Sequence, residues 1–545
     1  MNMFLCIGKK LQHLCSASCQ KVVCHSKSGF FLLTYFCRFV LRRANPLLVQ
    51  IVYFVSLSFL GFGVLKALKP RTPSFTPKNL DLFFTSVSAT TVSSMATVEM
   101  EVFSNPQLII MTILMFIGGE VFTSMVGLHF IRSRFKTELD KIASSHSNLS
   151  STNPIIVDQI ELGVVTNFNQ VSSLPKPNEV HNESHESLGT TSENLRYLSM
   201  KYLGYVVLVY LLVVHVIGVL AVSLYVSVIS SAKEVLKNKG LKMLTFSVFT
   251  VVSTFSSCGF VPTNENMVVF RKNSGLLLML IPQVLLGNTL FPPCLRFSIW
   301  FLGKFYKKKE SKYILKKTQE VGYKHLLPRK HSVLLVATVF GFILVQVIMF
   351  RSMDWNSEAL MGLNAYQKFI GVLFQSVNSR HTGETIVDLS TLSQAILVLF
   401  VVMMYLPPYT SFLPMKEDEQ DSESCDRMKK RRGKVLENLI FSQLSYLVIF
   451  IILVCITERK KLKEDPLNFN VLNIVIEVIS AYGNVGFTTG YSCDRQLHRE
   501  PNCQDKWIGF SGNWSDEGKI ILIIVMFFGR LKKFNMDGGK AWKLL

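Results

Sequence analysis

Hydrophobic residues in this chain gather into long runs that polar segments separate. Seven of the eight runs have 19–28 residues, enough for a helix to cross a hydrocarbon core of roughly 30 Å. Lipid offers the backbone no hydrogen-bond partners, so such runs must be helical. The pattern therefore predicts an all-α integral membrane protein with eight transmembrane helices. The runs lie near residues 47–65, 107–130, 202–229, 275–301, 332–350, 389–413, 436–456 and 518–530.

Four shorter apolar segments alternate with these runs, near residues 81–92, 243–255, 366–378 and 470–482. Each has about 10–14 residues, too few to cross a bilayer but enough for a helix that enters the membrane part-way. Asn79 and Asp81 open the first segment, and Asn468 and Asn470 open the fourth, so these side chains could cap the helices. Internal repetition of this kind predicts four membrane–pore-loop–membrane repeats with pseudo-fourfold symmetry around one pore.

The repeats and connections give the expected organisation of the chain. The segment 132–200 is rich in Ser, Asn and Glu and is expected to be disordered. The expected order is a cytosolic N-terminal segment (1–45), repeat A (46–131), a cytosolic loop (132–200), repeat B (201–302), a basic cytosolic loop (303–331), repeat C (332–414), a charged cytosolic loop (415–435), and repeat D with the C-terminal tail (436–545).

A polar, glycine-bearing motif follows each short segment. The four motifs are Thr91-Val-Ser-Ser94-Met, Ser256-Ser-Cys-Gly259-Phe, Arg380-His-Thr-Gly383-Glu and Gly483-Asn-Val-Gly486-Phe. A short helix followed by an extended glycine-bearing strand lets backbone carbonyls line a narrow ion path. The expected selectivity-filter residues are Ser94, Gly259, Gly383 and Gly486, and the residues directly before them are Ser93, Cys258, Thr382 and Val485.

The spacing within the repeats supports a common structure. A serine lies six residues before the filter position in three units (Ser88, Ser253 and Ser480), and Ser376 lies seven residues before it in the third. The alternative interpretation of each short segment is a buried helix beneath a loop. Four segments in register make that alternative unattractive.

Glycine at the narrow point lets carbonyl oxygens replace the water around a cation without an intruding side chain. The C-terminal, partly negative ends of four short helices would favour a cation and oppose an anion. Ser94 departs from this plan, because it adds a Cβ and a hydroxyl where the other units have none. We expect this asymmetry to disfavour the larger K⁺ more than Na⁺.

Two further features suggest elements of a gate. Arg530 ends the last run and either acts as an electrostatic barrier beneath the pore or extends to the inner surface. Pro407 and Pro408 interrupt the sixth run and precede Tyr409. They form either a broken segment that lines the cavity or simply the end of the span.

Composition and charge agree with a membrane protein. Hydrophobic residues make up 49% of the chain, charged residues only 17%, and the mean hydropathy is +0.33. The net charge of +21 could indicate nucleic acid as a partner. The basic runs Lys307–Lys309 and Lys429–Arg432 lie between spans, however, and favour the cytosol and anionic lipid. This orientation places both termini in the cytosol.

The cysteines and the remaining polar residues offer no catalytic centre. Cys493 and Cys503 lie in a polar loop on the expected outer side, where they could form a disulfide or stay reduced. The sequence shows no nucleotide cradle, catalytic triad or metal-ligand spacing. We therefore expect a protein that is not an enzyme and needs no cofactor, with Na⁺ or K⁺ as the transported ion.

These motifs resemble the plant HKT family within the Trk/Ktr/HKT superfamily of cation transporters. The stretches that carry the resemblance include Val98-Glu-Met-Glu-Val-Phe-Ser-Asn105, Val261-Pro-Thr-Asn-Glu-Asn266, Asn378-Ser-Arg-His-Thr-Gly-Glu384 and Ile479-Ser-Ala-Tyr-Gly-Asn-Val-Gly486. The resemblance implies the four-repeat fold, the filter residues named above, a homodimer with one pore in each protomer, and the plasma membrane. In this family, serine at the first filter position accompanies Na⁺ selectivity, and glycine there accompanies K⁺ permeation or Na⁺/K⁺ co-transport.

Three functional hypotheses remain from the sequence. The leading one is a passive Na⁺ uniporter or channel, and the second is a K⁺ or Na⁺/K⁺ pathway of the same fold. The third, from another class, is a polytopic membrane enzyme or receptor. An enzyme would need titratable groups clustered at one membrane depth, whereas the repeats offer glycines and carbonyls.

Overall fold

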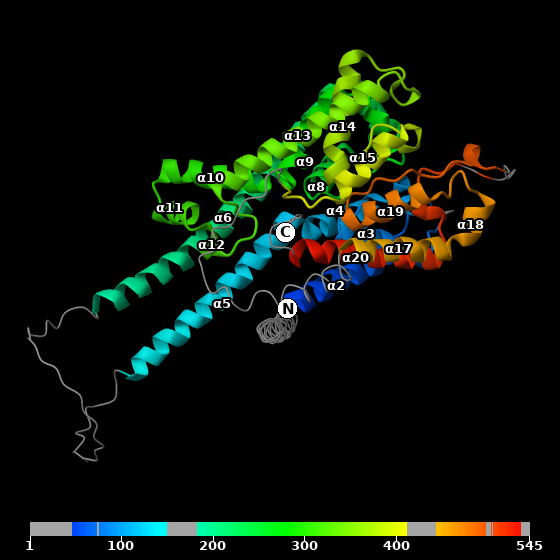
Figure 1. Cartoon of the computed structure of the whole chain (residues 1–545). Coiled ribbons are helices and arrows are strands. Elements are labelled where there is room, and N and C mark those ends of the chain that lie inside the picture. Colours follow the sequence, from blue (N-terminus) through cyan, green and yellow to red (C-terminus); the bar gives the residue numbers. More distant parts are fainter. Residues whose placement is uncertain are drawn as a thin grey trace, which may run out of the picture. The chain divides into compact units, whose positions relative to one another are not determined.

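The computed structural model describes residues 46–72, 76–149, 183–410, 443–497, 503 and 505–535. It divides into two units, Met1–Ser56 and Leu57–Leu545. The described residues form helices joined by turns and loops (Figure 1). The expected cytosolic segments 1–45 and 415–435 lie outside the described residues, as does the middle of 132–200.

The helices follow the order expected from the hydrophobic pattern. The α-helices are α2 (Pro46–Ala67), α3 (Asn79–Thr90), α4 (Asn105–Gly118), α5 (Glu120–Leu149), α6 (Glu183–Val228), α7 (Ser230–Asn238), α8 (Met243–Phe255), α9 (Ser274–Gly287), α10 (Phe291–Tyr306), α11 (Lys309–Lys316), α12 (Thr318–Val321), α13 (Arg329–Met353), α14 (Ala365–His381), α15 (Gln394–Tyr405), α17 (Gln443–Thr457), α18 (Arg459–Glu464), α19 (Val471–Gly483) and α20 (Asp516–Asn535). Short 3₁₀ helices are η1 (Met100–Val102), η2 (Asn266–Phe270), η3 (Glu358–Leu360), η4 (Leu389–Thr391), η5 (Cys493–Arg495) and η6 (Phe510–Asn513).

Helical backbone extends into both ends of the segment 132–200, which the sequence predicts to be disordered. Helix α5 continues to Leu149, and α6 begins at Glu183. Figure 1 shows these two helices projecting together beyond the other helices. Good helix formers such as Glu, Lys and Ala are also common in disordered chains, so composition alone does not distinguish helix from disorder at the ends of this segment.

Several described helices are long and apolar enough to cross a membrane. Three satisfy this by themselves: Leu47–Ala67, Glu193–Val228 and Arg329–Met353. Two bent pairs satisfy it together, α4 with α5 at 51° and α9 with α10 at 82°. The described residues therefore provide three spans by length and composition, or five if each bent pair is one span.

The other expected spans correspond to α15, α17 and α20, which are shorter or more polar. Helix α15 ends at Tyr405 because Pro407 and Pro408 cannot continue it. Helix α17 begins at Gln443, where the described chain resumes. Helix α20 carries acidic residues in its first turn and basic residues near its end, which lower its hydropathy.

The four short apolar segments form helices close to their expected bounds: α3, α8, α14 and α19. Asn470 caps α19 by accepting the Asn473 amide hydrogen at 2.8 Å. The expected cap of α3 is wrong. No cap bond from the side chain of the preceding residue, Lys78, is present, and Asp81 pairs instead with Lys519 of α20 at 2.8 Å.

Three of these short helices end against a glycine on the following long helix. In each pair, a Cβ built on the glycine would lie within about 2 Å of a carbonyl oxygen, so only glycine permits the contact. The pairs are Gly118 with Thr90 (2.0 Å), Gly287 with Phe255 (1.9 Å) and Gly529 with Tyr482 (2.0 Å). Each carbonyl lies four residues before an expected filter residue, so the contact fixes the depth of the filter segment in three units alike.

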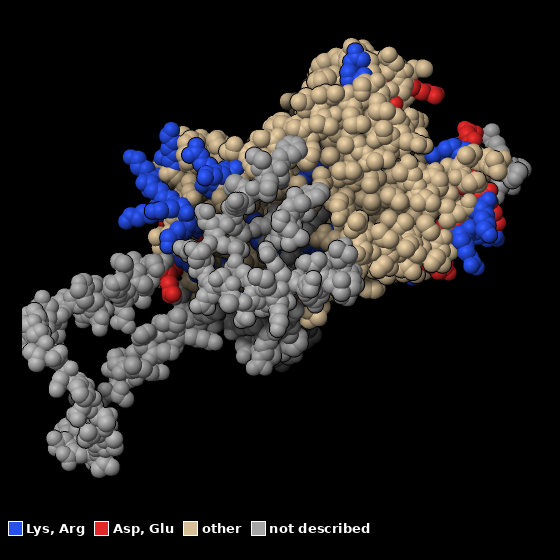
Figure 2. Space-filling model, in the orientation of Figure 1, with Lys and Arg blue, Asp and Glu red and all other residues tan. Residues whose placement is uncertain are grey.

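On the face shown in Figure 2, Lys and Arg gather over α10 and α11 and over α18, and a broad belt with few charged side chains lies between these groups. Many large apolar side chains between them are exposed, including Leu224, Phe340 and Leu344. Such a belt is too extensive for a soluble monomer and fits contact with lipid.

The glycine contacts lead to a prediction about stability. Replacing Gly529 by Ala forces a methyl group onto the Tyr482 carbonyl. We expect the free energy of unfolding to fall by about 1–3 kcal/mol, measured as a lower thermal midpoint of the detergent-purified protein. Gly204→Ala is the matched control, because no atom lies within 4 Å of its Cβ position. Equal midpoints for the two variants would contradict this account of the fold.

Candidate functional site

The four expected filter residues meet, although they lie far apart in the sequence. A Cβ built on Gly486 would lie 2.3 Å from the Ser94 Cβ, and one on Gly383 would lie 2.7 Å from the Gly486 carbonyl carbon. A Cβ on Gly259 would lie 2.3 Å from the Gly383 nitrogen. Gly259 and Ser94 line one cavity together. Ser94, Gly486, Gly383 and Gly259 are hereafter the ring residues.

Backbone conformation explains why glycine predominates in this ring. Gly259 and Gly486 have φ of +93° and +101°, a region that side chains rarely adopt. Ser94 has φ of +53°, so it adopts a left-handed conformation at a cost of about 1–2 kcal/mol. Its Cβ also stands where Gly486 approaches most closely. Ser94 is therefore both strained in its backbone and crowded by Gly486.

The serines six residues before the ring accept hydrogen bonds that tie the ring segments to the ends of the short helices. The hydroxyl oxygens of Ser253 and Ser480 accept the N–H groups of Gly259 and Gly486 at 3.1 and 3.0 Å. Three serine carbonyls also accept the N–H of the residue before the ring. The bonds run from Ser93 to Ser88 (2.8 Å), from Cys258 to Ser253 (2.9 Å) and from Val485 to Ser480 (3.0 Å).

The third unit differs, as the one-residue offset of its serine suggests. Helix α14 continues to His381, and the Thr382 N–H donates to the Asn378 carbonyl at 3.1 Å. The Thr382 hydroxyl also donates to the side-chain oxygen of Asn378. In this unit the bonds from Thr382 to Asn378 take the place of the bonds to serine in the other units.

The neighbours of the ring tie the units to one another. Asn484 donates to the Ser93 hydroxyl at 2.8 Å and to the Met526 carbonyl at 3.1 Å. Thr254 of α8 donates to the buried carboxyl group of Glu384. The sequence analysis did not single out Asn484 or Glu384, and their positions within the motifs were the available signal.

The ring can hold a desolvated monovalent cation by its chemistry. The N–H groups of Gly259 and Gly486 bond back to the short helices, so the polar groups that these two residues offer at the narrow point are their carbonyl oxygens. The C-terminal ends of α3, α8, α14 and α19 converge there and add partial negative charge. Oxygen ligands and a negative field are what a dehydrated cation requires.

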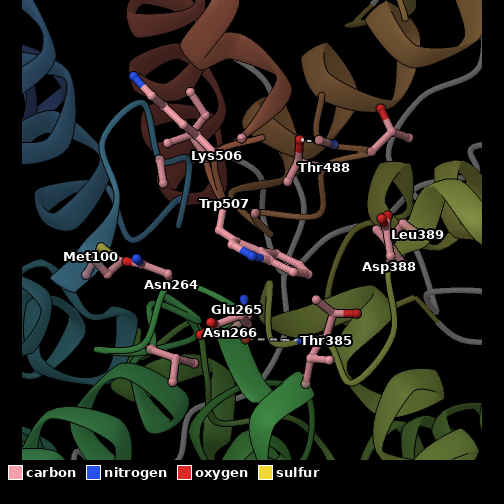
Figure 3. Close-up of a pocket in the computed structure, with 18 of the residues that line it drawn as sticks. Met100, Asn264, Glu265, Asn266, Thr385, Asp388, Leu389, Thr488, Lys506 and Trp507 are labelled. Atoms are coloured by element: carbon pink, nitrogen blue, oxygen red, sulfur yellow. Dashed lines mark hydrogen bonds between the residues drawn. The ribbon is translucent and has the colours of Figure 1, made fainter. Parts of the chain in front are cut away.

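A cavity of about 290 Å³ opens onto the ring (Figure 3). Ser94, Gly259 and Gly486 lie among its lining residues. Its polar wall includes Glu265, Asn266, Thr385, Asp388, Asp505 and Lys506. The cavity provides an aqueous approach to the ring with both acidic and basic groups along it.

The loop before α20 forms part of this wall. A disulfide joins Cys493 and Cys503, whose Cα atoms are 5.9 Å apart. The Cys493 N–H donates to Asp505 at 2.7 Å, and the Trp507 N–H donates to Glu99 at 3.2 Å. The crosslink therefore holds the segment that carries Trp507 beside the cavity.

Lys239 joins the first and second units. Its ammonium group lies 2.8 Å from Glu101 and 2.6 Å from Glu265. Burial alone would lower the pKa of Lys239, but hydrogen bonds and attraction from Glu101 and Glu265 outweigh burial and raise it. The lysine is therefore charged over the physiological range and fixes the position of Glu265 in the cavity wall.

Arg530 does not extend to the surface. Its side chain is only 1% exposed and donates to the Gly118 carbonyl, at the break between α4 and α5. Gly118 itself contacts the end of α3. The guanidinium group thus lies beside the contact between Gly118 and the end of the first short helix.

Two hydrogen bonds, one from Arg380 and one with His325, hold the segment Pro407-Pro408-Tyr409. Arg380 of α14 donates to the Pro407 carbonyl at 2.5 Å. The Tyr409 hydroxyl lies 2.7 Å from His325 Nδ1, in the connection between α12 and α13. The sequence analysis named the prolines and Tyr409 but not Arg380 or His325 as their partners, because no periodicity links these distant positions.

His325 lies outside the spans but is buried, 3.9 Å from Glu120 of α5. Burial lowers the pKa of His325, and Lys324 and Arg530 lower it further, while Glu120 opposes the shift. The neutral imidazole is therefore the form that suits the folded protein.

This shift predicts a pH-dependent contribution to stability. Below pH 6.5 the unfolded chain protonates His325 while the folded chain resists, so the wild type loses up to about 1.4 kcal/mol per pH unit until the folded pKa is reached. His325→Gln cannot titrate. We expect the difference in thermal midpoint between wild type and variant to shift against the wild type as pH falls from 7.5 to 5.5. A constant difference would contradict the expected shift.

Comparisons with known proteins identify a family and several relatives. Residues 143–536 match the TrkH family model, described as a cation transport protein. The chain is 50% identical to the cation transporter HKT1;3 of Oryza sativa subsp. japonica over 545 residues, covering 100% of both chains. It is 51% identical to the sodium transporter HKT1 of Arabidopsis thaliana over 493 residues, covering 88% of this chain and 91% of that protein.

A solved structure also shows a weak likeness. The potassium transporter TrkH from Vibrio parahaemolyticus matches with a TM-score of 0.49 and 13% identity, covering 90% of this chain and 83% of that one. The family assignment rests on the sequence relatives and not on this structural likeness.

Proposed function

We propose that this chain, which belongs to the TrkH family of cation transport proteins as an HKT1-type transporter, carries Na⁺ passively across the plasma membrane. It is a transporter and not an enzyme. The observation that carries the proposal is the ring, in which Gly259, Gly383 and Gly486 lie too close to the next segment for a Cβ and Ser94 lies against Gly486. The transported ion would exchange its water shell for the carbonyl oxygens of these residues.

The proposed architecture is four membrane–pore-loop–membrane repeats around this ring. Two features that recur among the units support it. The ends of α3, α8 and α19 each contact a glycine, and serine carbonyls accept the N–H of the residue before the ring in the same three units. In the third unit, Arg380 bonded to Pro407 takes the place of a glycine contact. The repeats would then be related by approximate rather than exact symmetry.

Ser94 is the proposed source of Na⁺ preference. Its Cβ occupies the space beside Gly486, so the Ser94 carbonyl oxygen has less room to move away from a larger ion. Dehydrated K⁺ would require that movement, and the smaller Na⁺ would not. Arg530 and the segment Pro407-Pro408-Tyr409 are the proposed barrier and gate on the inner side, because they contact the pore-helix supports.

The proposal also covers orientation and assembly. The basic residues of α10 and α11 would face the cytosol and anionic lipid, which places both termini inside. The expected partners are membrane lipid and a second copy of the chain in a homodimer, without nucleic acid. The homodimer rests on the family resemblance.

Reversal potentials in cells expressing the chain test the function. We expect the reversal potential to follow the Na⁺ gradient and to remain nearly constant when external K⁺ replaces an inert cation. Dependence on both gradients would instead support a K⁺ or Na⁺/K⁺ pathway. Absence of current from protein at the cell surface would count against transport by this route.

Replacement of Ser94 by Gly should raise the K⁺/Na⁺ permeability ratio severalfold, because it removes the Cβ and hydroxyl that crowd Gly486. The ratio is measured from reversal potentials under bi-ionic conditions. Ser257→Gly is the matched control: Ser257 also has a positive φ (+63°) but is not a ring residue. An unchanged ratio in surface-expressed Ser94→Gly would show that Ser94 does not set the preference.

A further inference from the structure

Asn266 connects the second unit to the ring residue of the third. It begins η2 in the loop that follows Gly259, and its side chain lies in the wall of the cavity (Figure 3). Its amide nitrogen donates to the carbonyl oxygen of Gly383 at 3.1 Å. A side chain from one unit thus bonds directly to a carbonyl that the proposed function assigns to the ion.

The other half of the Asn266 amide is also engaged. Its side-chain oxygen accepts the N–H of Met267 at 2.8 Å and the N–H of Thr385 at 3.3 Å. The dashed line in Figure 3 marks the bond to Thr385. One amide therefore spans both ends of the short Gly383–Thr385 segment and fixes its direction.

The backbone holds this amide in place. Asn266 has φ of +56°, a conformation that asparagine tolerates better than most residues. The Thr263 hydroxyl donates to the Asn266 carbonyl at 2.6 Å, and the Met267 N–H donates to the Thr385 carbonyl at 3.1 Å. The clamp is therefore built from a rigid loop and not from a freely rotating surface side chain.

This bond distinguishes the Gly383 carbonyl from the carbonyls of the other three ring residues. Within the described residues, Gly383 receives a side-chain hydrogen bond on its carbonyl, whereas no such bond reaches the carbonyls of Ser94, Gly259 or Gly486. A carbonyl that accepts a hydrogen bond has one lone pair occupied and a restricted direction. It can neither rotate freely toward a passing ion nor withdraw to admit a larger one.

We propose that Asn266 is a specificity-determining positioning residue, which restrains the Gly383 carbonyl and thereby strengthens discrimination against K⁺. The inference rests on the proposed function, because it assigns Gly383 to the ion path. It adds a second source of selectivity to Ser94, on the other side of Gly486 in the ring. It does not require Asn266 to contact the ion itself.

Asn266→Asp is the sharpest test. A carboxylate keeps an oxygen for the N–H groups of Met267 and Thr385 but replaces the donor to Gly383 with an acceptor, which repels the carbonyl. Asn266→Gly is the second variant, because glycine tolerates the positive φ and removes the clamp without adding charge. We expect each to raise the K⁺/Na⁺ permeability ratio about three- to tenfold, in line with the loss of one hydrogen bond.

Asn264→Asp is the matched control. Asn264 lines the same cavity two residues earlier, and its side-chain oxygen accepts the Glu101 N–H at 2.9 Å. This variant adds the same charge to the same wall and keeps that acceptor, but it does not contact Gly383. We expect its permeability ratio to remain that of the wild type, even if the total current changes.

The permeability ratio separates positioning from a general structural role, because it does not depend on how many molecules reach the surface. An unchanged ratio in both Asn266 variants, beside a Na⁺-selective wild type, overturns the inference. An equal change in Asn264→Asp also overturns it and assigns the effect to charge in the cavity. Loss of both Asn266 variants from the surface, while Asn264→Asp arrives normally, overturns it in favour of a folding role. A wild type without Na⁺ current is a failure of the proposed function instead.

Discussion

Close approach of four backbone segments is the constraint on which the rest of this structure depends. Gly259, Gly383 and Gly486 each lie so near the next segment that a Cβ would overlap backbone or side-chain atoms. Such an approach is possible only if the backbone N–H groups find partners elsewhere, because a buried unpaired donor is costly. The serine hydroxyls and carbonyls at the ends of the short helices supply those partners. The helices, their glycine contacts and the loops around the ring all serve this arrangement.

The ring is held from several sides, and each side belongs to a different unit. Asn484 links the fourth unit to the first, Asn266 links the second to the third, and Lys239 joins the first and second. Arg530 and Arg380 donate to carbonyls where long helices break or end. These links make the ring a product of the whole membrane-embedded core. A change in one unit can therefore alter the carbonyl of another.

Hydrophobic pattern and motif spacing predicted much of this molecule. The short helices lie near their expected bounds, because lipid forces apolar segments into helices. The four positions that the sequence predicts as the filter lie together, and their role as a filter stays a prediction. The sequence was less informative at polar positions. Asp81 pairs with Lys519 instead of capping α3, and helix extends into the ends of a segment that composition suggested was disordered.

The sequence by itself determined which residues could form a ring: glycines where no side chain fits, a serine where one unit departs, and helices short enough to point at them. Tertiary structure alone decided how those units meet. It placed Asn266 on the Gly383 carbonyl, His325 on Tyr409 and Arg530 on Gly118, pairs separated by 117, 84 and 412 residues. Local pattern reports only the periodicity of a segment and the turns that bound it. A hydrogen bond between distant segments depends on where the whole chain has placed both partners, and no local property of either residue contains that information.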